Sequence, residues 1–252
     1  MRETPAADSA IPRLELPSWQ ERFGVTAGLT TRGPAGDYSL PLWSAGAPAA
    51  DVLGRWSAFR ASFGGAFPAL AFGRQVHGNR VALHDGPGEG MLLLEGYDGH
   101  ATARPGLLLA VSVADCVPVY LATRTGNAVA LLHAGWRGTA AGILERGVTQ
   151  LSGVAQVPSG DIVMHCGVAI CGDCYEVGSD VYESVTGRKT PGPARLDLRA
   201  ELALQGQRLG VGEITVSPWC TAHDRDRFHS HRATGGNAGR MIAYLGIPAS
   251  TP

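Results

Sequence analysis

Three short apolar runs that follow one another along the chain constrain the fold most. They are Leu107–Val113, Val117–Ala122 and Asn127–His133, separated first by a segment that contains Asp115 and then by Arg124-Thr125-Gly126-Asn127. Each run falls far short of the roughly 18–20 apolar residues that a membrane-spanning helix needs. Runs of this length, bounded by turn-forming residues, are typical of buried strands. The segment therefore predicts three consecutive strands in a folded core and no membrane role.

The rest of the chain mixes helical and strand patterns without a regular strand–helix–strand rhythm. Helical spacing of apolar residues appears in Asp51–Phe63, Gly138–Gly153, Ser179–Thr186, Leu198–Leu209 and Ala238–Leu245. Further strand patterns are Val25–Thr30, Val81–His84, Ile162–His165 and Ile214–Val216. This order favours an α+β fold, in which mixed β-sheets are flanked by helices, over a doubly wound parallel sheet.

Length and composition indicate a single domain without the charge of a nucleic-acid binder. The 252 residues suffice for one large core, and we expect one catalytic domain over residues 17–250. Residues 1–16 carry prolines and acids but no apolar segment of a signal peptide, so they are expected to be a disordered tail. The net charge is −1, from 21 basic and 22 acidic residues, which argues against a nucleic-acid partner.

The cysteine count points to reduced thiols. Five cysteines are an odd number in a sequence without an export signal, so we expect a cytoplasmic protein in which a functional cysteine is a ligand or a nucleophile. Nothing in the sequence indicates an oligomer, and a monomer is the default expectation.

The loop between the second and third runs determines whether Cys116 and His133 meet. If Thr125-Gly126 form a two-residue hairpin loop, the numbers of paired residues sum to 251, and Cys116 faces Gly135 with His133 two residues away. A loop at Arg124-Thr125 gives a sum of 249 and places Cys116 directly opposite His133. Either register puts the thiol and the imidazole on one face, whereas a three-residue loop separates them.

A thiol and an imidazole at adjacent strand ends are two of the ligands that Zn²⁺ prefers. His77, in Gln75-Val76-His77-Gly78, is the natural third ligand because the following glycine lets a ligand approach the backbone. Three protein ligands leave one coordination position for water or substrate, as in catalytic sites. The alternative is a buried cysteine beside a hydrogen-bonded core histidine.

Two further features have both a functional and a structural interpretation. Gly135-Trp136-Arg137-Gly138 precedes a helix pattern and could bind phosphate through free N–H groups and the Arg137 guanidinium; the alternative is a plain strand-to-helix turn. The remaining cysteines could form a structural zinc site or a redox pair with the histidines, but a single Cys-x-x-Cys is a weak signal, and Cys166 and Cys171 are expected to be core thiols. These residues are Cys166, Cys171, Cys174, His223, His229 and His231.

The motifs together resemble those of the YfiH/YlmD family, known as laccase-domain or multicopper polyphenol oxidase proteins and as purine nucleoside phosphorylases. The resemblance runs from about Phe23 to Gly246. In order, its segments are Thr30-Thr31-Arg32-Gly33, Tyr38-Ser39-Leu40, Gln75–Gly78, Asp98 with Thr102, Ala114-Asp115-Cys116-Val117-Pro118, His133-Ala134-Gly135-Trp136-Arg137-Gly138, Gly167–Ile170 with Cys174–Val177, Cys220-Thr221, Phe228–Arg232 and Gly239-Arg240.

The resemblance implies a fold related to a bacterial toxin deamidase (CNF-toxin-like) and a metal triad of His77, Cys116 and His133. It implies zinc more often than copper, and phosphorolysis of adenosine, inosine, guanosine and methylthioadenosine together with adenosine deamination. Some bacterial members are described instead as peptidoglycan editing factors. Asp115 is expected to act as a base or to orient His133. The residues expected to bind nucleoside and phosphate are Arg32, Arg137, Ser230 and Arg232.

Overall fold

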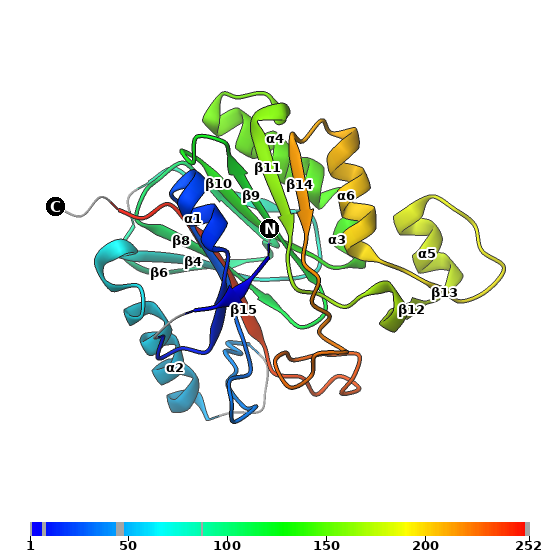
Figure 1. The fold of residues 1–252 in the computed structure, drawn as a ribbon, viewed down its shortest axis with the longest axis horizontal. Coiled ribbons are helices and arrows are strands. Elements are labelled where there is room, and N and C mark those ends of the chain that lie inside the picture. The colour runs from blue at the N-terminus through cyan, green and yellow to red at the C-terminus, as the bar shows by residue number, and fades with distance from the viewer. Residues whose placement is uncertain (1, 7–8, 44–47, 87, 250–252) are drawn as a thin grey trace.

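The computed structural model describes residues 2–6, 9–43, 48–86 and 88–249, and within them two large mixed sheets lie face to face (Figure 1). The first sheet has the order β1 (Thr4–Pro5), β2 (Arg13–Glu15), β3 (Thr26–Thr30), β15 (Met241–Gly246), β8 (Leu107–Val113), β4 (Ala69–Arg74) and β6 (Gly90–Glu95). The second has the order β14 (Glu213–Val216), β11 (Ile162–Cys166), β9 (Val117–Thr123), β10 (Val129–Ala134), β7 (Gly99–Thr102) and β5 (Val81–His84). A small third sheet pairs β12 (Glu176–Val177) with β13 (Ala194–Arg195).

Six α-helices are found in the described residues. They are α1 (Pro17–Phe23), α2 (Ala49–Ala61), α3 (Trp136–Ala140), α4 (Ile143–Ala155), α5 (Ser179–Thr186) and α6 (Leu198–Arg208), with short 3₁₀ turns η1 (Gly64–Ala66), η2 (Ser159–Asp161) and η3 (Gly172–Cys174). The buried side chains of α1, Trp19 and Phe23, pack into the core between the sheets. α2 lies against the first sheet, and α4 and α6 lie against the second (Figure 1). The predicted α+β fold with mixed sheets and flanking helices is therefore confirmed.

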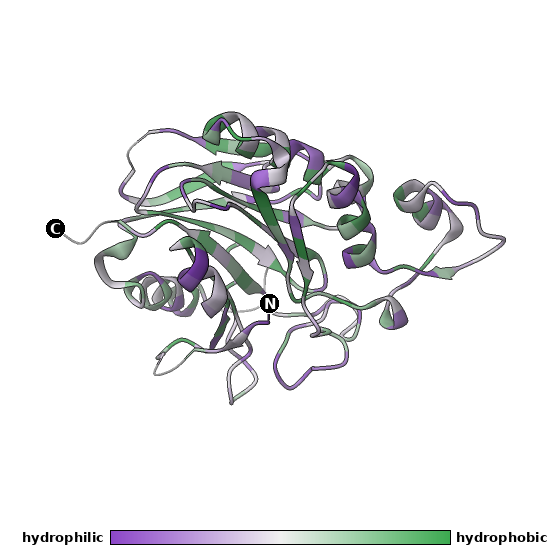
Figure 2. Ribbon diagram, turned by 45° about the horizontal axis from the view of Figure 1, so that its top comes forward, coloured by the Kyte–Doolittle hydropathy of each residue, from purple (hydrophilic) through white to green (hydrophobic). Residues whose placement is uncertain are grey.

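Alternate residues of the central strands face opposite layers, because successive side chains of a strand point to opposite faces. On β9, Tyr120 packs between the sheets, while Val119 and Leu121 pack toward the helices. On β15, Tyr244 faces α2, where its ring centroid lies 5.7 Å from that of Phe59. Burial on both faces explains the continuous apolar runs of the sequence, which form the green interior in Figure 2.

The hairpin register agrees with one of the two predicted alternatives. Val129 pairs with Ala122 and His133 pairs with Pro118, so the numbers of each pair sum to 251. The three predicted consecutive strands are β8, β9 and β10, but they do not belong to one sheet: β8 lies in the first sheet, and β9 and β10 lie in the second. The chain thus crosses between the sheets at the segment that contains Asp115.

Three local predictions were wrong. The expected disordered tail (residues 1–16) instead adds β1 and β2 to the first sheet, and Glu3 is buried; strands of two and three residues are too short to show an alternating pattern. Ala238–Leu245 was expected to be helical, but its residues from Met241 onward belong to β15, because a short apolar run fits both periods. The helix predicted over Gly138–Gly153 is two helices, α3 and α4, separated at Gly142, whose φ is +79°.

No helix in the described ranges combines the length and the apolar character needed to cross a bilayer.

The β9–β10 turn offers a test of the packing that sets the register. Gly126 has a φ of +69°, and a Cβ there would overlap the carbonyl oxygen of Phe23. Gly24 has nearly the same φ, +68°, but open space around its Cβ position. We expect both alanine variants to lose about 1–2 kcal/mol of unfolding free energy from left-handed backbone strain. Gly126→Ala should lose about 1–3 kcal/mol more from overpacking.

Urea unfolding of the two variants measures the difference. Equal losses would show that the turn does not pack against the end of α1.

Candidate metal centre and its pocket

The candidate centre lies where two parallel strands end. β4 and β8 are parallel neighbours in the first sheet, so their carboxyl ends reach the same edge. After each strand the chain crosses to the second sheet, by residues 75–80 toward β5 and by residues 114–116 toward β9. His77 lies in the first crossing and Cys116 in the second, and His133 lies near the end of β10, next to the start of β9.

Gln75 ties the two crossings together. Its side-chain amide donates to the carbonyl oxygen of Ser112 over 2.9 Å, and its Oε1 accepts the N–H of Ser112 over 2.7 Å. The side chain thus continues the β4–β8 pairing beyond the point where the β4 backbone leaves the sheet. This contact fixes the direction in which the chain approaches His77.

The structure brings together the three side chains predicted to bind metal. One ligand atom each from His77, Cys116 and His133 lies within 4.8 Å of the others, and the two imidazole centroids are 4.9 Å apart. His77 is exposed, Cys116 is half-buried and His133 is buried. Gly135 leaves room for them, because a Cβ at this position would lie 3.1 Å from both Cys116 Sγ and His77 Cδ2.

Asp98 holds two of the three donors. Its buried carboxylate accepts the N–H groups of Val76, His77 and Gly78 over 3.2, 2.9 and 2.8 Å. The Oδ1 atom also lies 2.9 Å from His133 Nδ1. If Nδ1 carries the proton, Nε2 is available to bind a metal, the arrangement that a carboxylate typically imposes on a metal-binding histidine. Burial opposes the charged form of Asp98, but His133 and the N–H groups of Gly78 and Val76 lower its pKa.

Cys116 and His133 stabilise each other's charged forms. Burial raises the pKa of the Cys116 thiol, but the charge and hydrogen bonds of His133 and His77 outweigh it and bring the pKa to about 6. Burial likewise opposes a proton on His133, but Cys116 and Asp98 raise its pKa to about 9. The thiolate, which is the form that binds metals and attacks electrophiles, is therefore favoured at neutral pH.

Backbone strain is concentrated at the same place. Of the described residues other than glycine, His77, Asp115 and Gln156 have a positive φ, of 60°, 89° and 55°. Two of these three belong to the crossings that carry the candidate ligands. Such conformations cost energy and persist where the surroundings hold them, which is characteristic of functional sites.

The role predicted for Asp115 in orienting His133 is wrong, since Asp98 does this. The Asp115 carboxylate instead accepts the Thr221 hydroxyl over 2.6 Å and the N–H of Arg232 over 2.7 Å. Asp115 therefore joins the Cys116 crossing to the segment that follows β14. Its predicted role as a base remains a prediction.

The donors open into a pocket of about 610 Å³, a size typical of small-molecule sites. Its aromatic lining residues are Trp43, Phe72, Trp136 and Tyr175, and its arginines are Arg74, Arg137, Arg232 and Arg240. Trp43 and Phe72 are stacked, with centroids 4.9 Å apart. The pocket thus combines flat apolar walls with positive charge beside the candidate metal ligands.

Two of the four predicted substrate-binding residues line this pocket and two do not. Arg137 lies 4.2 Å over the Trp136 ring, and no hydrogen bond or ion pair of its guanidinium is found in the described part of the chain. Arg232 lies over Tyr175 and donates to the Glu176 carbonyl. Arg32, by contrast, donates to the carbonyl oxygens of Gly36 and Arg225, away from the pocket.

Ser230 is also outside the lining, since it is buried and accepts the N–H of Ala233. The geometry therefore does not support the predicted phosphate contact of Arg32 or the predicted pocket position of Ser230, whereas Arg137 and Arg232 face the same space as the donors.

Comparison with known proteins identifies the family. The profile of the family described as "Multi-copper polyphenol oxidoreductase laccase" matches residues 36–248. The chain belongs to this family. It is 34% identical over 245 residues to a purine nucleoside phosphorylase of Deinococcus radiodurans, a match that covers 94% of this chain and 91% of the relative.

Solved members of the family share the architecture. The crystal structure of the hypothetical protein YfiH of Bacillus licheniformis superposes with a TM-score of 0.86 at 28% identity and covers 96% of this chain and 98% of its own. The crystal structure of YlmD from Geobacillus stearothermophilus superposes with a TM-score of 0.86 at 30% identity and covers 97% of this chain and 98% of its own. A protein of that organism named purine nucleoside phosphorylase YlmD is 34% identical over 254 residues, covering 88% of this chain and 90% of the relative.

Asp98 and Gln75 were recognised in the sequence only as parts of family motifs, without a role. Each acts on a residue more than 30 positions away, Asp98 on His133 and Gln75 on Ser112. A pattern along the chain cannot indicate such a contact. The residues that follow Asp98, Gly99-His100-Ala101-Thr102, show no apolar run that would mark a strand end.

Replacing the carboxylate that orients His133 should weaken metal binding. An Asp98→Asn side chain keeps the shape but loses the charge and the acceptor facing His133 Nδ1. We expect about a 10–100-fold loss of metal affinity, measured by competition with a chelating dye. Asp115→Asn is the matched control, since Asp115 does not contact a ligand side chain; a larger loss for that control would contradict the assignment.

The pH dependence of Cys116 alkylation tests the electrostatics of the metal-free centre. With a pKa of about 6, the thiolate is present at neutral pH and is lost as the pH falls through 6. The rate at which iodoacetamide modifies Cys116, measured by peptide mapping, should therefore rise with pH with a midpoint near pH 6. Added Zn²⁺ should protect Cys116 from modification. Cys166, whose pKa burial raises to about 12, is the internal control. A Cys116 midpoint near that of an ordinary thiol would contradict the ion pair.

Proposed function

We propose that this protein is a zinc-dependent purine nucleoside phosphorylase that acts on adenosine, inosine, guanosine and methylthioadenosine. Adenosine deamination is proposed at the same site. The observation that carries the proposal is one pocket in which two imidazoles and a thiolate, arginines and aromatic rings come together. The names of the relatives from Deinococcus radiodurans and Geobacillus stearothermophilus support the same activity.

The donor set is suited to zinc. His77, Cys116 and His133 supply two nitrogens and one sulfur, which are borderline-soft ligands that Zn²⁺ accepts with a fourth position open. A blue-copper centre also uses His₂Cys, with a weak axial methionine, glutamine or backbone oxygen. No methionine lines the described pocket, and both polar atoms of the Gln75 side chain there are hydrogen-bonded to Ser112. A bound zinc ion would supply Lewis acidity next to the substrate.

The aromatic residues are placed to hold a purine. Trp43, which is 44% exposed and stacked on the buried Phe72 ring, lines the pocket. Trp136 and Tyr175, whose rings also carry Arg137 and Arg232, line it as well. Stacking of a base on an aromatic ring is favourable and tolerant of the base's substituents. This tolerance is consistent with a range of purine nucleosides as substrates.

The arginines are placed to hold phosphate. Arg137 and Arg232 each lie over an aromatic ring, which keeps the guanidinium planes against the wall. A guanidinium binds two phosphate oxygens at once, so it fixes the orientation of the anion as well as its position. Phosphate held in this way is pre-oriented for attack, which lowers the entropic part of the barrier.

The reaction exchanges one bond at the ribose. A phosphate oxygen forms a bond to C1′ as the C1′–N9 bond breaks, the electron pair goes to the purine, and the purine takes up a proton. The products are ribose 1-phosphate and the free base. In deamination, water instead adds to C6 and ammonia leaves, and phosphate takes no part.

A second candidate is a hydrolase of cell-wall precursors with Cys116 as the nucleophile. The low pKa of Cys116 favours this alternative, because its thiolate would attack while the protonated His133, with Asp98 behind it, would donate a proton to the leaving group. A copper-dependent polyphenol oxidase is the third, suggested by the description of the family.

Incubation with adenosine, with and without phosphate, separates phosphorolysis from deamination. We expect phosphate-dependent release of adenine and ribose 1-phosphate, and phosphate-independent formation of inosine. Metal content by mass spectrometry, measured on the same sample, should give zinc. Turnover of neither kind would refute the nucleoside proposal, and copper with phenol oxidation would establish the third candidate.

Two variants link the activity to the residues. Cys116→Ala should abolish both activities and metal retention at this centre. Arg137→Ala should raise the KM for phosphate about 10-fold or more by removing a charge-assisted contact, and should leave inosine formation without phosphate nearly unchanged. Arg32→Ala is the matched control outside the pocket; full phosphorolysis by metal-free Cys116→Ala would overturn the assignment.

A further inference from the structure

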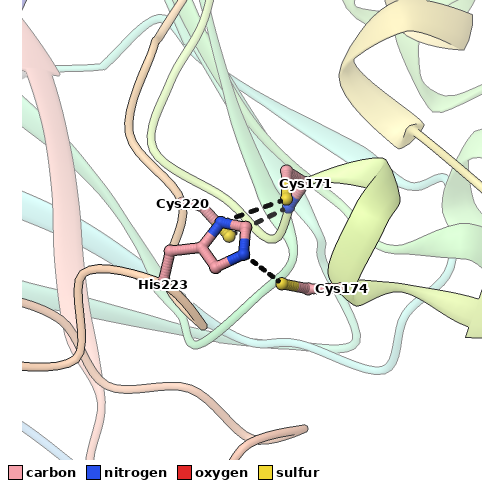
Figure 3. Close-up of side chains that lie close together, drawn as sticks. All are labelled: Cys171, Cys174, Cys220 and His223. Atoms are coloured by element: carbon pink, nitrogen blue, oxygen red, sulfur yellow. Dashed lines mark hydrogen bonds between the residues drawn. The ribbon is translucent and has the colours of Figure 1, made fainter.

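A second group of metal-binding side chains lies apart from the triad. Cys171, Cys174, Cys220 and His223 point toward one another (Figure 3), and one ligand atom of each lies within 4.8 Å of the others. Cys174 Sγ is 3.2 Å from His223 Nε2, and Cys171 Sγ is 3.6 Å from His223 Nδ1. The sequence provided only a weak indication of a zinc site here, from a single Cys-x-x-Cys pair, and Cys171 was expected to be a core thiol. Cys171 is instead half-buried and belongs to this cluster.

The sequence pattern becomes specific once the fold joins two distant segments. Cys171-Gly-Asp-Cys174 forms the η3 turn, and Cys220-Thr-Ala-His223 follows β14. A parallel bridge between Ala169 and Cys220 sets the two segments side by side. The combined pattern is Cys-x-x-Cys with Cys-x-x-His, the spacing of closed structural zinc sites.

From this geometry we propose that Cys171, Cys174, Cys220 and His223 bind a structural Zn²⁺ ion. Four protein ligands complete a tetrahedron and leave no position for substrate, unlike the triad. With Zn–S bonds of about 2.3 Å and Zn–N bonds of about 2.0–2.1 Å, the ligand atoms of a tetrahedral site lie roughly 3.5–3.8 Å apart. The cluster needs only a small contraction, and one nitrogen of His223 turned toward the ion, to reach this geometry.

Backbone contacts around the cluster support it. The N–H of Cys171 points at Cys220 Sγ over 3.3 Å, which stabilises a thiolate there. The carboxylate of Asp224 accepts the N–H of Cys220 over 3.0 Å, and the N–H of Asp224 returns to the Cys220 carbonyl. These contacts fix the turn that presents Cys220 and His223, as the surroundings of a metal site must fix its ligands.

A zinc ion at this site would connect two chain segments that form part of the pocket wall. Tyr175, which directly follows Cys174, lines the pocket and carries Arg232 over its ring. Thr221, which directly follows Cys220, donates to Asp115 beside Cys116. A zinc ion would therefore join the segment of Tyr175 to the segment that leads to Arg232, and its presence does not depend on which reaction the pocket performs.

Metal stoichiometry of the whole protein, purified with zinc in the growth medium, tests the proposal. By native and elemental mass spectrometry we expect two zinc ions per chain in the wild type. Cys174→Ser and His223→Ala should each retain one zinc ion, Cys116→Ser should retain the other, and Cys116→Ser with Cys174→Ser should retain none. Cys166→Ser, at a buried cysteine outside both groups, should retain two.

A second measurement does not depend on stoichiometry alone. In cobalt-substituted protein, Cys174→Ser should lose most of the thiolate-to-cobalt absorbance, because three of the four cysteines in the two groups belong to this cluster. The melting temperature of His223→Ala should fall by about 5 °C or more relative to the wild type. Since His223 is exposed, the substitution itself removes no core packing.

Three outcomes would overturn the proposal. One zinc ion per chain in the wild type, with Cys174→Ser unchanged, would exclude the second ion. A disulfide between Cys171 and Cys174 in the purified protein would assign the pair to redox chemistry. A metal other than zinc that disappears with Cys174→Ser would show that the cluster holds a different ion.

Discussion

A single buried carboxylate, Asp98, holds the candidate active centre together. It accepts three consecutive N–H groups of the His77 crossing and faces the His133 ring, while its own carbonyl accepts the N–H of His133. An unpaired carboxylate at this depth would be costly, so its burial is compensated only when all of these partners are in place. The strained backbone of His77 is thus stabilised by the same group that orients the second imidazole.

The crossings between the two sheets explain why the centre lies at this edge. In a strand, the backbone N–H and C=O groups form hydrogen bonds with the neighbouring strands. Where the chain leaves the sheet, these groups need other hydrogen-bond partners. Gln75 and Asp98 supply them with side chains, and the glycines that follow make close approach possible. A Cβ at Gly138 would lie 2.7 Å from the Gly78 carbonyl oxygen, so α3 can lie against the His77 crossing only without a side chain there.

The sequence predicted those parts of the fold and the site that depend on local pattern. The apolar runs of β8, β9 and β10 and the turn at Gly126 placed Cys116 and His133 on one face, and the observed register is one of the two predicted. It could not show that β8 belongs to the other sheet, because the central strands of both sheets are buried on both faces and look alike. Contacts between distant segments, such as Asp98 with His133 or Cys171 with Cys220, left no local signal.

The same electrostatics would serve a nucleophilic thiolate or a metal ligand, and His77 distinguishes the two. A Cys116–His133 pair backed by Asp98 is already sufficient for nucleophilic attack, so a second imidazole adds nothing to that chemistry. Yet His77 is held with a φ of 60° by a loop whose three successive N–H groups are hydrogen-bonded to Asp98. Its ring centroid lies 4.9 Å from that of His133. Strain retained at a residue that one mechanism does not need favours the mechanism that needs it. The arrangement is therefore explained better by coordination of a metal ion than by a thiol acting alone.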